Sequence, residues 1–221
     1  MSESKQQAYA LLRAWKGENY VFGIGVMDQL GQLVRRFGTR ALVVSSGRHS
    51  QEKIRQGLDS LDQAGVSMVT DVCVPGAKPN APREDVYRLE SYLLHYKPDC
   101  VVAIGGGSTI DACKAATVLA AYGAEVTPEI GHYFGTGVVS DIEKELGRKR
   151  IPLIAVETAA SSGAHLTKYS NVTDPVAGQK LLIVDPAITP DAALFDYSIT
   201  ESVPMGTTLD GALDGIAHTF E

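Results

Sequence analysis

Three successive glycines separate an apolar run from an alanine-rich segment in residues 99–122, DCVVAIGGGSTIDACKAATVLAAY. The run up to Ile104 is apolar without alternation, as is typical of a strand buried on both faces of a parallel sheet. Residues 108–122 are long and rich in alanine, which predicts a helix. The stretch therefore predicts a strand that passes directly into a helix.

The same alternation of strand and helix extends towards the N-terminus. In chain order, the pattern predicts a strand at 20–24, a helix at 26–37 closed by Gly38, a strand at 41–44, a helix at 50–64, a strand at 66–74, a helix at 83–96 and a strand at 99–104. Such alternation predicts an α/β fold: a Rossmann-like parallel sheet with helices on both faces.

The second half of the chain is less regular. It predicts a loop at 123–147 with a short helix at 140–146, a strand at 151–156, a β-hairpin of 169–172 with 180–184, a strand at 192–195 and a helix at 204–221. The last helix has no C-cap glycine and no basic last turn, so we expect it to continue in a longer protein. The pattern therefore predicts an α/β domain over 1–203 and a separate final helix over 204–221.

Composition and charge exclude several functional classes. The chain has 221 residues, 20 basic and 26 acidic, and a formal charge of −6 without a concentrated basic face, which argues against nucleic-acid binding. No apolar stretch approaches the about 20 residues of a membrane span. The three cysteines lack a CxxC spacing and the N-terminus lacks a signal core, so we expect free thiols and a cytoplasmic location.

The glycine cluster 105–107 has two physical readings. Residues without side chains let the backbone approach a phosphate, and the helix N-terminus that follows points its amides and positive dipole end at the anion. Ser108 would serve as the N-cap. The alternative is a tight turn that requires positive φ, which explains one glycine more easily than three. The cluster favours a diphosphate site, although it matches neither GxGxxG nor a P-loop.

Acidic and imidazole side chains recur on the final predicted helix. Asp210, Asp214 and His218 are spaced four residues apart and so share one face. A carboxylate and an imidazole at this spacing can hold a divalent ion, but such pairs are also common on solvated helix faces. His165 follows a turn of small residues after a predicted strand, and it is a further candidate to face the crevice in which Asp214 and His218 would lie.

Four stretches together resemble the iron-containing alcohol dehydrogenase family, within the group that includes glycerol dehydrogenase and dehydroquinate synthase. They are 22–25 with 37–38, the loop IGGGSTIDACKA at 104–115, the segment from 184–186 through 190–191 to 195–196, and LDGIAHTFE at 213–221, which is similar to the family's DALxHAxE metal helix.

The resemblance implies a dinucleotide-binding α/β domain at 1–203, followed at 204–221 by the first helix of an all-helical metal-binding second domain that is mostly absent. It implies a metal-dependent oxidoreductase that transfers hydride between an alcohol and an aldehyde or ketone, with NAD or NADP as cofactor. It implies Fe²⁺, or alternatively Zn²⁺, held by one aspartate and three histidines, of which two are matched here. The substrate would be a small alcohol or aldehyde and the protein a homodimer or higher homo-oligomer. The implied cofactor-binding residues are Ser46, Gly105, Gly106, Gly107, Ser108, Asp111, Thr158, Ser162 and Lys180, and the implied metal ligands are Asp214 and His218.

Two departures from the family pattern affect the cofactor and the substrate. The usual stretch TTxGTGSE reads TAASSGAH at 158–165, so His165 replaces the glutamate. Ser46, followed by Arg48, stands where many members have the aspartate that binds the adenosine ribose. The alternatives are a related reductase or lyase acting on a phosphorylated or polyol substrate, and a non-catalytic dinucleotide-binding domain.

Overall fold

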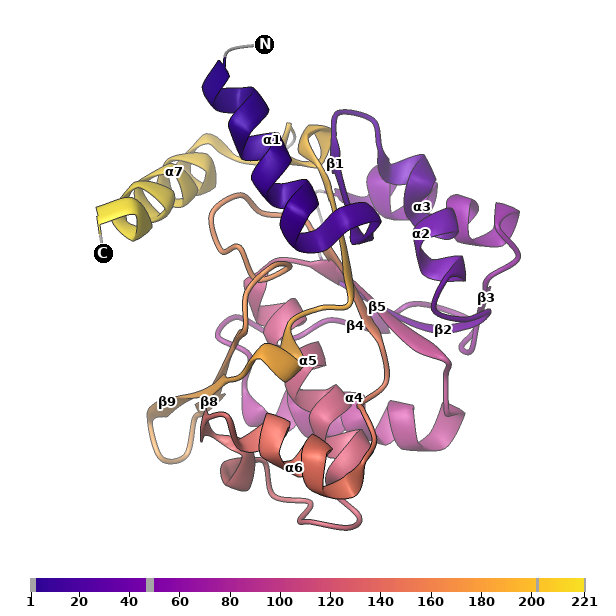
Figure 1. Ribbon diagram of the computed structural model, residues 1–221, viewed down its shortest axis with the longest axis vertical. Coiled ribbons are helices and arrows are strands. Elements are labelled where there is room, and N and C mark those ends of the chain that lie inside the picture. The colour runs from indigo at the N-terminus through magenta and orange to yellow at the C-terminus, as the bar shows by residue number, and fades with distance from the viewer. Residues whose placement is uncertain (1–2, 47–49, 202, 221) are drawn as a thin grey trace.

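The computed structural model describes residues 3–46, 50–201 and 203–220, and its centre is a seven-stranded parallel sheet (Figure 1). The strands lie in the order β1 (Tyr20–Gly23), β10 (Ala192–Asp196), β7 (Leu153–Glu157), β5 (Cys100–Gly105), β2 (Arg40–Ser45) and β3 (Ser67–Met68), while β4 (Val74–Pro75) also pairs with β2. The predicted α/β fold is confirmed.

Helices cover both faces of this sheet, as predicted (Figure 1). One face packs against α2 (Leu30–Arg35) and α3 (Gln51–Gln63), and the other against α4 (Arg83–Tyr96), α5 (Gly107–Tyr122) and α6 (Val138–Leu146). Alternate side chains of a single strand enter the two cores, because successive residues of a strand point to opposite faces. In β2, Leu42 and Val44 join the core of α4 and α5, whereas Val43 joins that of α2 and α3.

A second, smaller sheet flanks α5. The predicted hairpin is present as β8 (Tyr169–Asp174) and β9 (Gln179–Val184), which pair antiparallel, and β6 (Gly135–Thr136) pairs with β9. Ser170 Oγ donates to the Asp111 carbonyl of α5 at 2.8 Å. This contact fastens the hairpin to the helix that begins at the glycine cluster.

Three local predictions need correction. The segment 66–74 is not one strand: β3 and β4 pair with opposite ends of β2, and the chain bends out between them. The helix at 26–37 is a 3₁₀ turn, Met27–Gln29, followed by α2, which ends at Arg35. Gly38 does not cap that helix; a Cβ there would lie 2.2 Å from the Asp99 Cβ, so packing requires the glycine.

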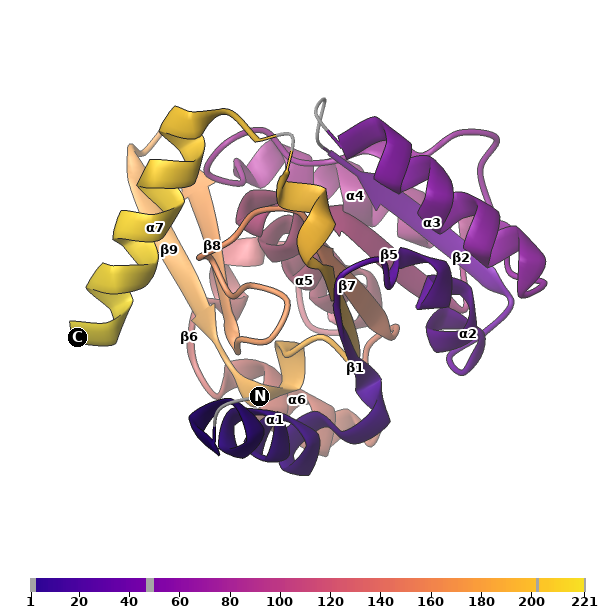
Figure 2. The same cartoon turned by 90° about the horizontal axis from the view of Figure 1, so that it is seen from above.

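Helices at the two ends of the chain complete the architecture (Figure 2). The N-terminal α1 (Glu3–Lys16) was not predicted, whereas α7 (Met205–Phe220) agrees with the predicted final helix. The other 3₁₀ turns described are Gly17–Asn19, Ile130–Tyr133, Pro186–Ile188 and Tyr197–Thr200. Within the described ranges, no helix combines the length and the apolar character needed to cross a membrane.

Candidate functional site: a glycine turn at the start of α5

The glycine cluster forms the turn between β5 and α5. Gly106 is the N-cap of α5 in an extended conformation, with φ −81° and ψ −177°. Positive φ occurs at ten described glycines, but at none of the three in this cluster. The turn therefore does not need glycine for its backbone angles, and that alternative is wrong.

Space explains two of the glycines and leaves the third open. A Cβ at Gly105 would lie 2.5 Å from Ser46 Oγ, and a Cβ at Gly107 would lie 3.1 Å from Ser162 Cβ. At Gly106 the nearest contact within 4 Å would be Ala159 Cβ, at the ordinary distance of 3.6 Å. Neighbouring side chains thus pack against the outer two glycines, while the Gly106 backbone stays open to a ligand.

The amides of this turn are available to bind an anion. The Gly106 carbonyl accepts the first helical hydrogen bonds, from the amides of Thr109 at 3.0 Å and Ile110 at 3.2 Å. The amides of residues 106–108 precede these donors, and no side chain caps this end of the helix. Ser108 is not the N-cap that we predicted; its Oγ accepts from the Asn80 amide at 3.0 Å. Uncapped amides at the positive end of a 16-residue helix suit a phosphate.

Ser46 lies at the carboxyl end of β2, directly beside the turn. Its Oγ is 2.8 Å from Thr109 Oγ1, which in turn accepts from the Ala77 amide at 3.2 Å. The hydroxyl therefore links β2, α5 and the segment after β4, a contact that the sequence pattern did not reveal. Arg48 lies outside the described residues.

The segment after β7 brings two more predicted cofactor residues to the turn. The buried Thr158 donates its amide to the Gly105 carbonyl at 3.1 Å, and Ser162 packs on Gly107. Between them Ser161 has φ +105°, a conformation that L-residues rarely adopt. The residue stands where the family pattern TTxGTGSE has its first glycine. This segment is thus held close to the turn in a strained conformation.

Asp111 and Lys114 lie one turn further along α5 and are buried. The Asp111 carboxylate accepts from the Asn171 amide at 3.0 Å, and burial raises its pKa although nearby Lys114 opposes the shift. Lys114 Nζ donates to the carbonyls of Thr167 and Tyr169 at 2.8 and 2.7 Å, and burial lowers its pKa to about 8. Both side chains hold β8 and the residues just before it against α5. Because these contacts are structural, contact between Asp111 and a cofactor stays a prediction.

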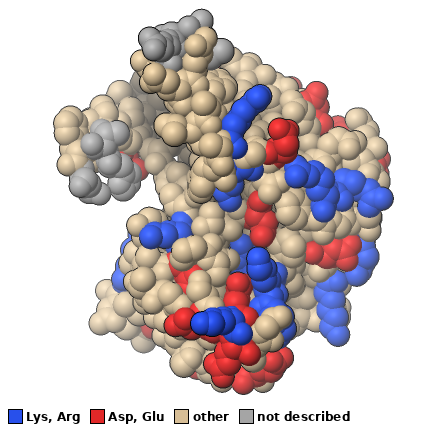
Figure 3. All heavy atoms as spheres, viewed as in Figure 1, with Lys and Arg blue, Asp and Glu red and all other residues tan. Residues whose placement is uncertain are grey.

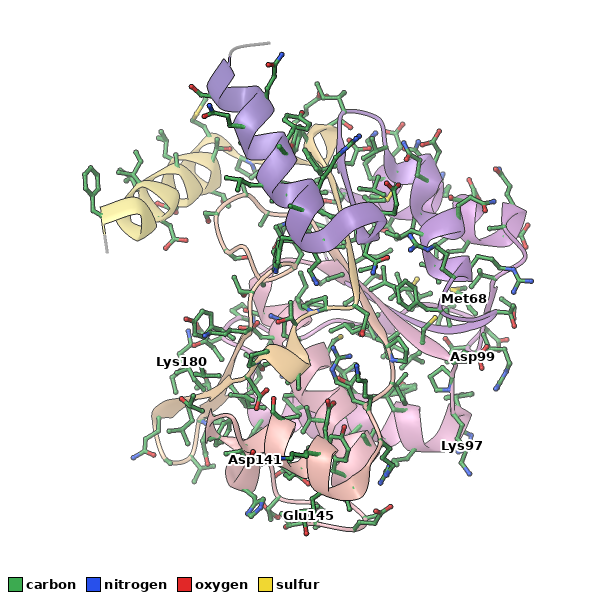
Figure 4. All side chains as sticks on the ribbon, in the orientation of Figure 1. Met68, Lys97, Asp99, Asp141, Glu145 and Lys180 are labelled. Carbon is green, nitrogen blue, oxygen red and sulfur yellow. The ribbon has the colours of Figure 1, made fainter. Side chains whose placement is uncertain are left out.

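Lys180 is exposed and lies on β9 (Figure 4). It pairs with Thr173 of β8, whose hydroxyl donates to the Asn80 carbonyl at 2.7 Å. Asn80 in turn contacts Ser108, so this hairpin adjoins the glycine turn. The predicted role of Lys180 towards the nicotinamide or ribose remains a prediction.

One face of α7 rests against the segment after β7. A Cβ at Gly211 would lie 3.0 Å from the Ala160 carbonyl oxygen, and one at Gly215 would lie 3.9 Å from Ser161 Cβ. Positions 214 and 218 share this face by helical spacing, so the predicted metal ligands belong to the side nearest the turn. The side chain of His218 lies outside the described residues.

The opposite face of α7 is apolar and exposed, as expected if the helix packs against further structure. It presents Met205, Leu209, Leu213, Ile216 and Phe220, each more than half exposed. The surface is hollowed below α7, between this helix and the lobe of β8 and β9 (Figure 3). In the described part of the chain no three His, Cys, Asp or Glu side chains are grouped to hold a metal, so these residues do not form a complete site.

Sequence reasoning missed Glu157 and Tyr20. The carboxylate of Glu157 is buried and accepts from His165, whose other ring nitrogen contacts the Tyr20 hydroxyl. The available signal was an acidic residue at the end of an apolar strand, next to Thr158. Nothing in the sequence joined Tyr20 to His165, which lie 145 residues apart.

The fold is a Rossmann-like α/β domain, and its glycine turn leaves uncapped amides at the N-terminus of α5. Residues 17–197 match the family model of iron-containing alcohol dehydrogenases, and the chain belongs to this family.

Individual relatives are similar over most of this chain. It is 31% identical over 201 residues to the probable alcohol dehydrogenase EutG of Salmonella typhimurium, which covers 90% of this chain and 47% of the relative. It is 28% identical to the NAD-dependent methanol dehydrogenase of Bacillus methanolicus, over 91% of this chain and 50% of the relative. The structure of NADH-dependent butanol dehydrogenase A from Thermotoga maritima aligns with a TM-score of 0.77 and 26% identity, over 92% of this chain and 48% of that one. The chain thus spans about half the length of these relatives.

Proposed function

We propose that this chain is the dinucleotide-binding part of a metal-dependent NAD(P) alcohol dehydrogenase, which transfers hydride between an alcohol and an aldehyde or ketone. The observation that carries the proposal is the open backbone at Gly106, where uncapped amides of α5 can bind a diphosphate. This turn fits the diphosphate of a dinucleotide, because Gly106, the glycine of the cluster with the most free space, is also the N-cap of α5. Family membership supports the same class of reaction.

Each predicted residue has a proposed role towards the cofactor. The amides of 106–108 would bind the diphosphate, with Asp111 close by, and Thr158, Ser162 and Lys180 would line the nicotinamide and its ribose. When bound, the nicotinamide supplies the carbon that accepts or donates the hydride. The chain's own part is to orient that ring and keep water away from it.

Cofactor choice is proposed to depend on Ser46. A serine supplies no carboxylate that would repel a 2′-phosphate, and its hydroxyl is engaged by Thr109. We therefore propose that NADP(H) is tolerated alongside NAD(H).

A metal, Fe²⁺ or alternatively Zn²⁺, is proposed to bind Asp214 and His218. A catalytic site needs at least three protein ligands, and the described residues offer no group of three. We propose that further ligands, besides Asp214 and His218, are supplied by residues that the structure does not describe. We propose that residues 204–221 belong to a helical unit distinct from residues 1–203, and that the protein acts in the cytoplasm as a homo-oligomer on a small alcohol or aldehyde.

The second candidate function is a dinucleotide-binding module without catalysis. It is supported by the described side chains, among which no three potential ligands are grouped around one metal position. It predicts that the 221 residues bind dinucleotide but show negligible alcohol oxidation with added Fe²⁺ or Zn²⁺. Robust turnover that disappears in Asp214→Ala would contradict this reading.

Titration of the full chain with NADH and NADPH, followed by nucleotide fluorescence, tests the proposed cofactor site. Gly106→Val should lower affinity more than tenfold, because its side chain fills the open cradle, with an unchanged far-UV circular dichroism spectrum. Gly131→Val is the control: a Cβ there would meet nothing within 4 Å, so the site tolerates a side chain as Gly106 does, but it lies in a separate 3₁₀ turn. Unchanged affinity in folded Gly106→Val would refute the site, and NADH binding more than tenfold tighter than NADPH would refute the role of Ser46.

A further inference from the structure

Four side chains form a continuous hydrogen-bonded chain beside the glycine turn. Ser162 Oγ donates to Glu157 Oε2 at 2.9 Å, and His165 Nδ1 lies 3.1 Å from the same oxygen. His165 Nε2 lies 3.2 Å from the Tyr20 hydroxyl. Glu157 and His165 are 1% and 5% exposed, so the centre of the chain is shielded from water.

His165 is held from both sides of its ring. One ring nitrogen of His165 thus meets the oxygen that also accepts from Ser162, and the other meets the Tyr20 hydroxyl. The ring of Phe195 packs edge-on against the imidazole, with centroids 5.6 Å apart. Hydrogen bonds and packing therefore fix the orientation of His165.

Glu157 is an unfavourable residue for stability alone. Its Oε1 is buried and has no hydrogen-bond partner within the described structure. A buried carboxylate that is only partly satisfied is usually less favourable than an apolar side chain of similar size. The contacts of Oε2 therefore point to a role for Glu157 in holding Ser162 and His165 in place.

Those two residues belong to the segment that packs on the glycine turn. Glu157 lies next to Gly105 across β7 and β5, and its partner Ser162 packs on Gly107. The strained Ser161 lies between Glu157 and its partner Ser162. A conformation of this kind persists only where surrounding contacts determine it.

We infer that Glu157 and His165 are positioning residues that form a buried clasp, holding residues 158–162 against the glycine turn. The clasp is anchored to the edge strand β1 through Tyr20. In the family pattern the position of His165 carries a glutamate; here the carboxylate reaches the same segment from the end of β7. The consequence for cofactor affinity rests on the proposed function, whereas the consequence for local order does not.

Hydrogen exchange on the full chain without ligand is the first test. Glu157→Leu should increase the exchange of amides in 158–165 and 105–109 at least tenfold, while Glu157→Gln, which can still hydrogen-bond Ser162 and His165, should stay within threefold of wild type. Asp185→Leu is the matched control, because Asp185 is also a buried carboxylate that accepts from a serine and a backbone amide. Its exchange should increase around 138–140 and 185–188 instead.

Titration with NADH and NADPH is the second test. Glu157→Leu and His165→Leu should lower affinity at least tenfold, Glu157→Gln should restore it to within threefold, and Asp185→Leu should leave it unchanged. Wild-type exchange at 158–165 in folded Glu157→Leu, or an equal affinity loss in Asp185→Leu, would overturn the clasp. Failure of wild type to bind either nucleotide would refute the proposed function, and the exchange measurement would still decide the clasp.

Discussion

Replacing Ser161 with glycine should stabilise the protein. The residue has φ +105°, and a non-glycine residue in such a region costs about 1–3 kcal/mol. Glycine removes that strain but adds about 0.4–1 kcal/mol of backbone freedom to the unfolded chain. The difference is a net gain of about 1 kcal/mol, or roughly 2–4 °C in Tm for a chain of this size.

Urea denaturation followed by far-UV circular dichroism measures this gain. Ala160→Gly is the control: Ala160 is in the same segment without positive φ, so glycine there should lower the free energy of unfolding by about 0.4–1 kcal/mol. A Ser161→Gly variant no more stable than wild type would show that φ at this position carries no strain. If the strain serves the site, the more stable variant should also bind dinucleotide more weakly.

Two further predictions concern buried groups away from the open cradle. Burial lowers the pKa of Lys114 from about 10.5 to about 8, so between these pH values the unfolded chain keeps a proton that the folded chain has lost. The contribution of Lys114 to stability should therefore rise by about 3 kcal/mol from pH 8 to pH 10.5. Urea unfolding of wild type and Lys114→Met at several pH values isolates this contribution; a pH-independent difference would contradict it. Gly31→Ala should destabilise by about 3 kcal/mol in the same assay at neutral pH, since its Cβ would lie 1.9 Å from the Ser60 carbonyl oxygen of α3. A loss under 1 kcal/mol would show that α2 and α3 separate easily.

Sequence pattern predicted the elements whose signals are local. The apolar run 99–104 and the helical segment 108–122 carry their periodicity within themselves, so β5 and α5 followed directly. The hairpin of β8 and β9 was visible in two β-rich runs around a turn. The strand predicted at 66–74 failed because only pairing with β2 decides which of its residues are extended.

The glycine turn, too, was predictable from the sequence only in part. Three glycines before a helix were enough to predict an anion site, because helix amides and absent side chains are local properties. That Gly105 and Gly107 are packed against, and that Gly106 is the open one of the three, depends on Ser46, which follows β2, and on Ser162 in the loop after β7. The clasp is a stronger case, since Tyr20 comes from the edge strand β1, whereas Glu157 ends β7 and His165 lies in the loop that follows, 145 residues from Tyr20. The sequence determined which local structures could form, and tertiary packing determined which side chains share a buried space, because hydrogen bonds in that space depend on distance and not on chain order.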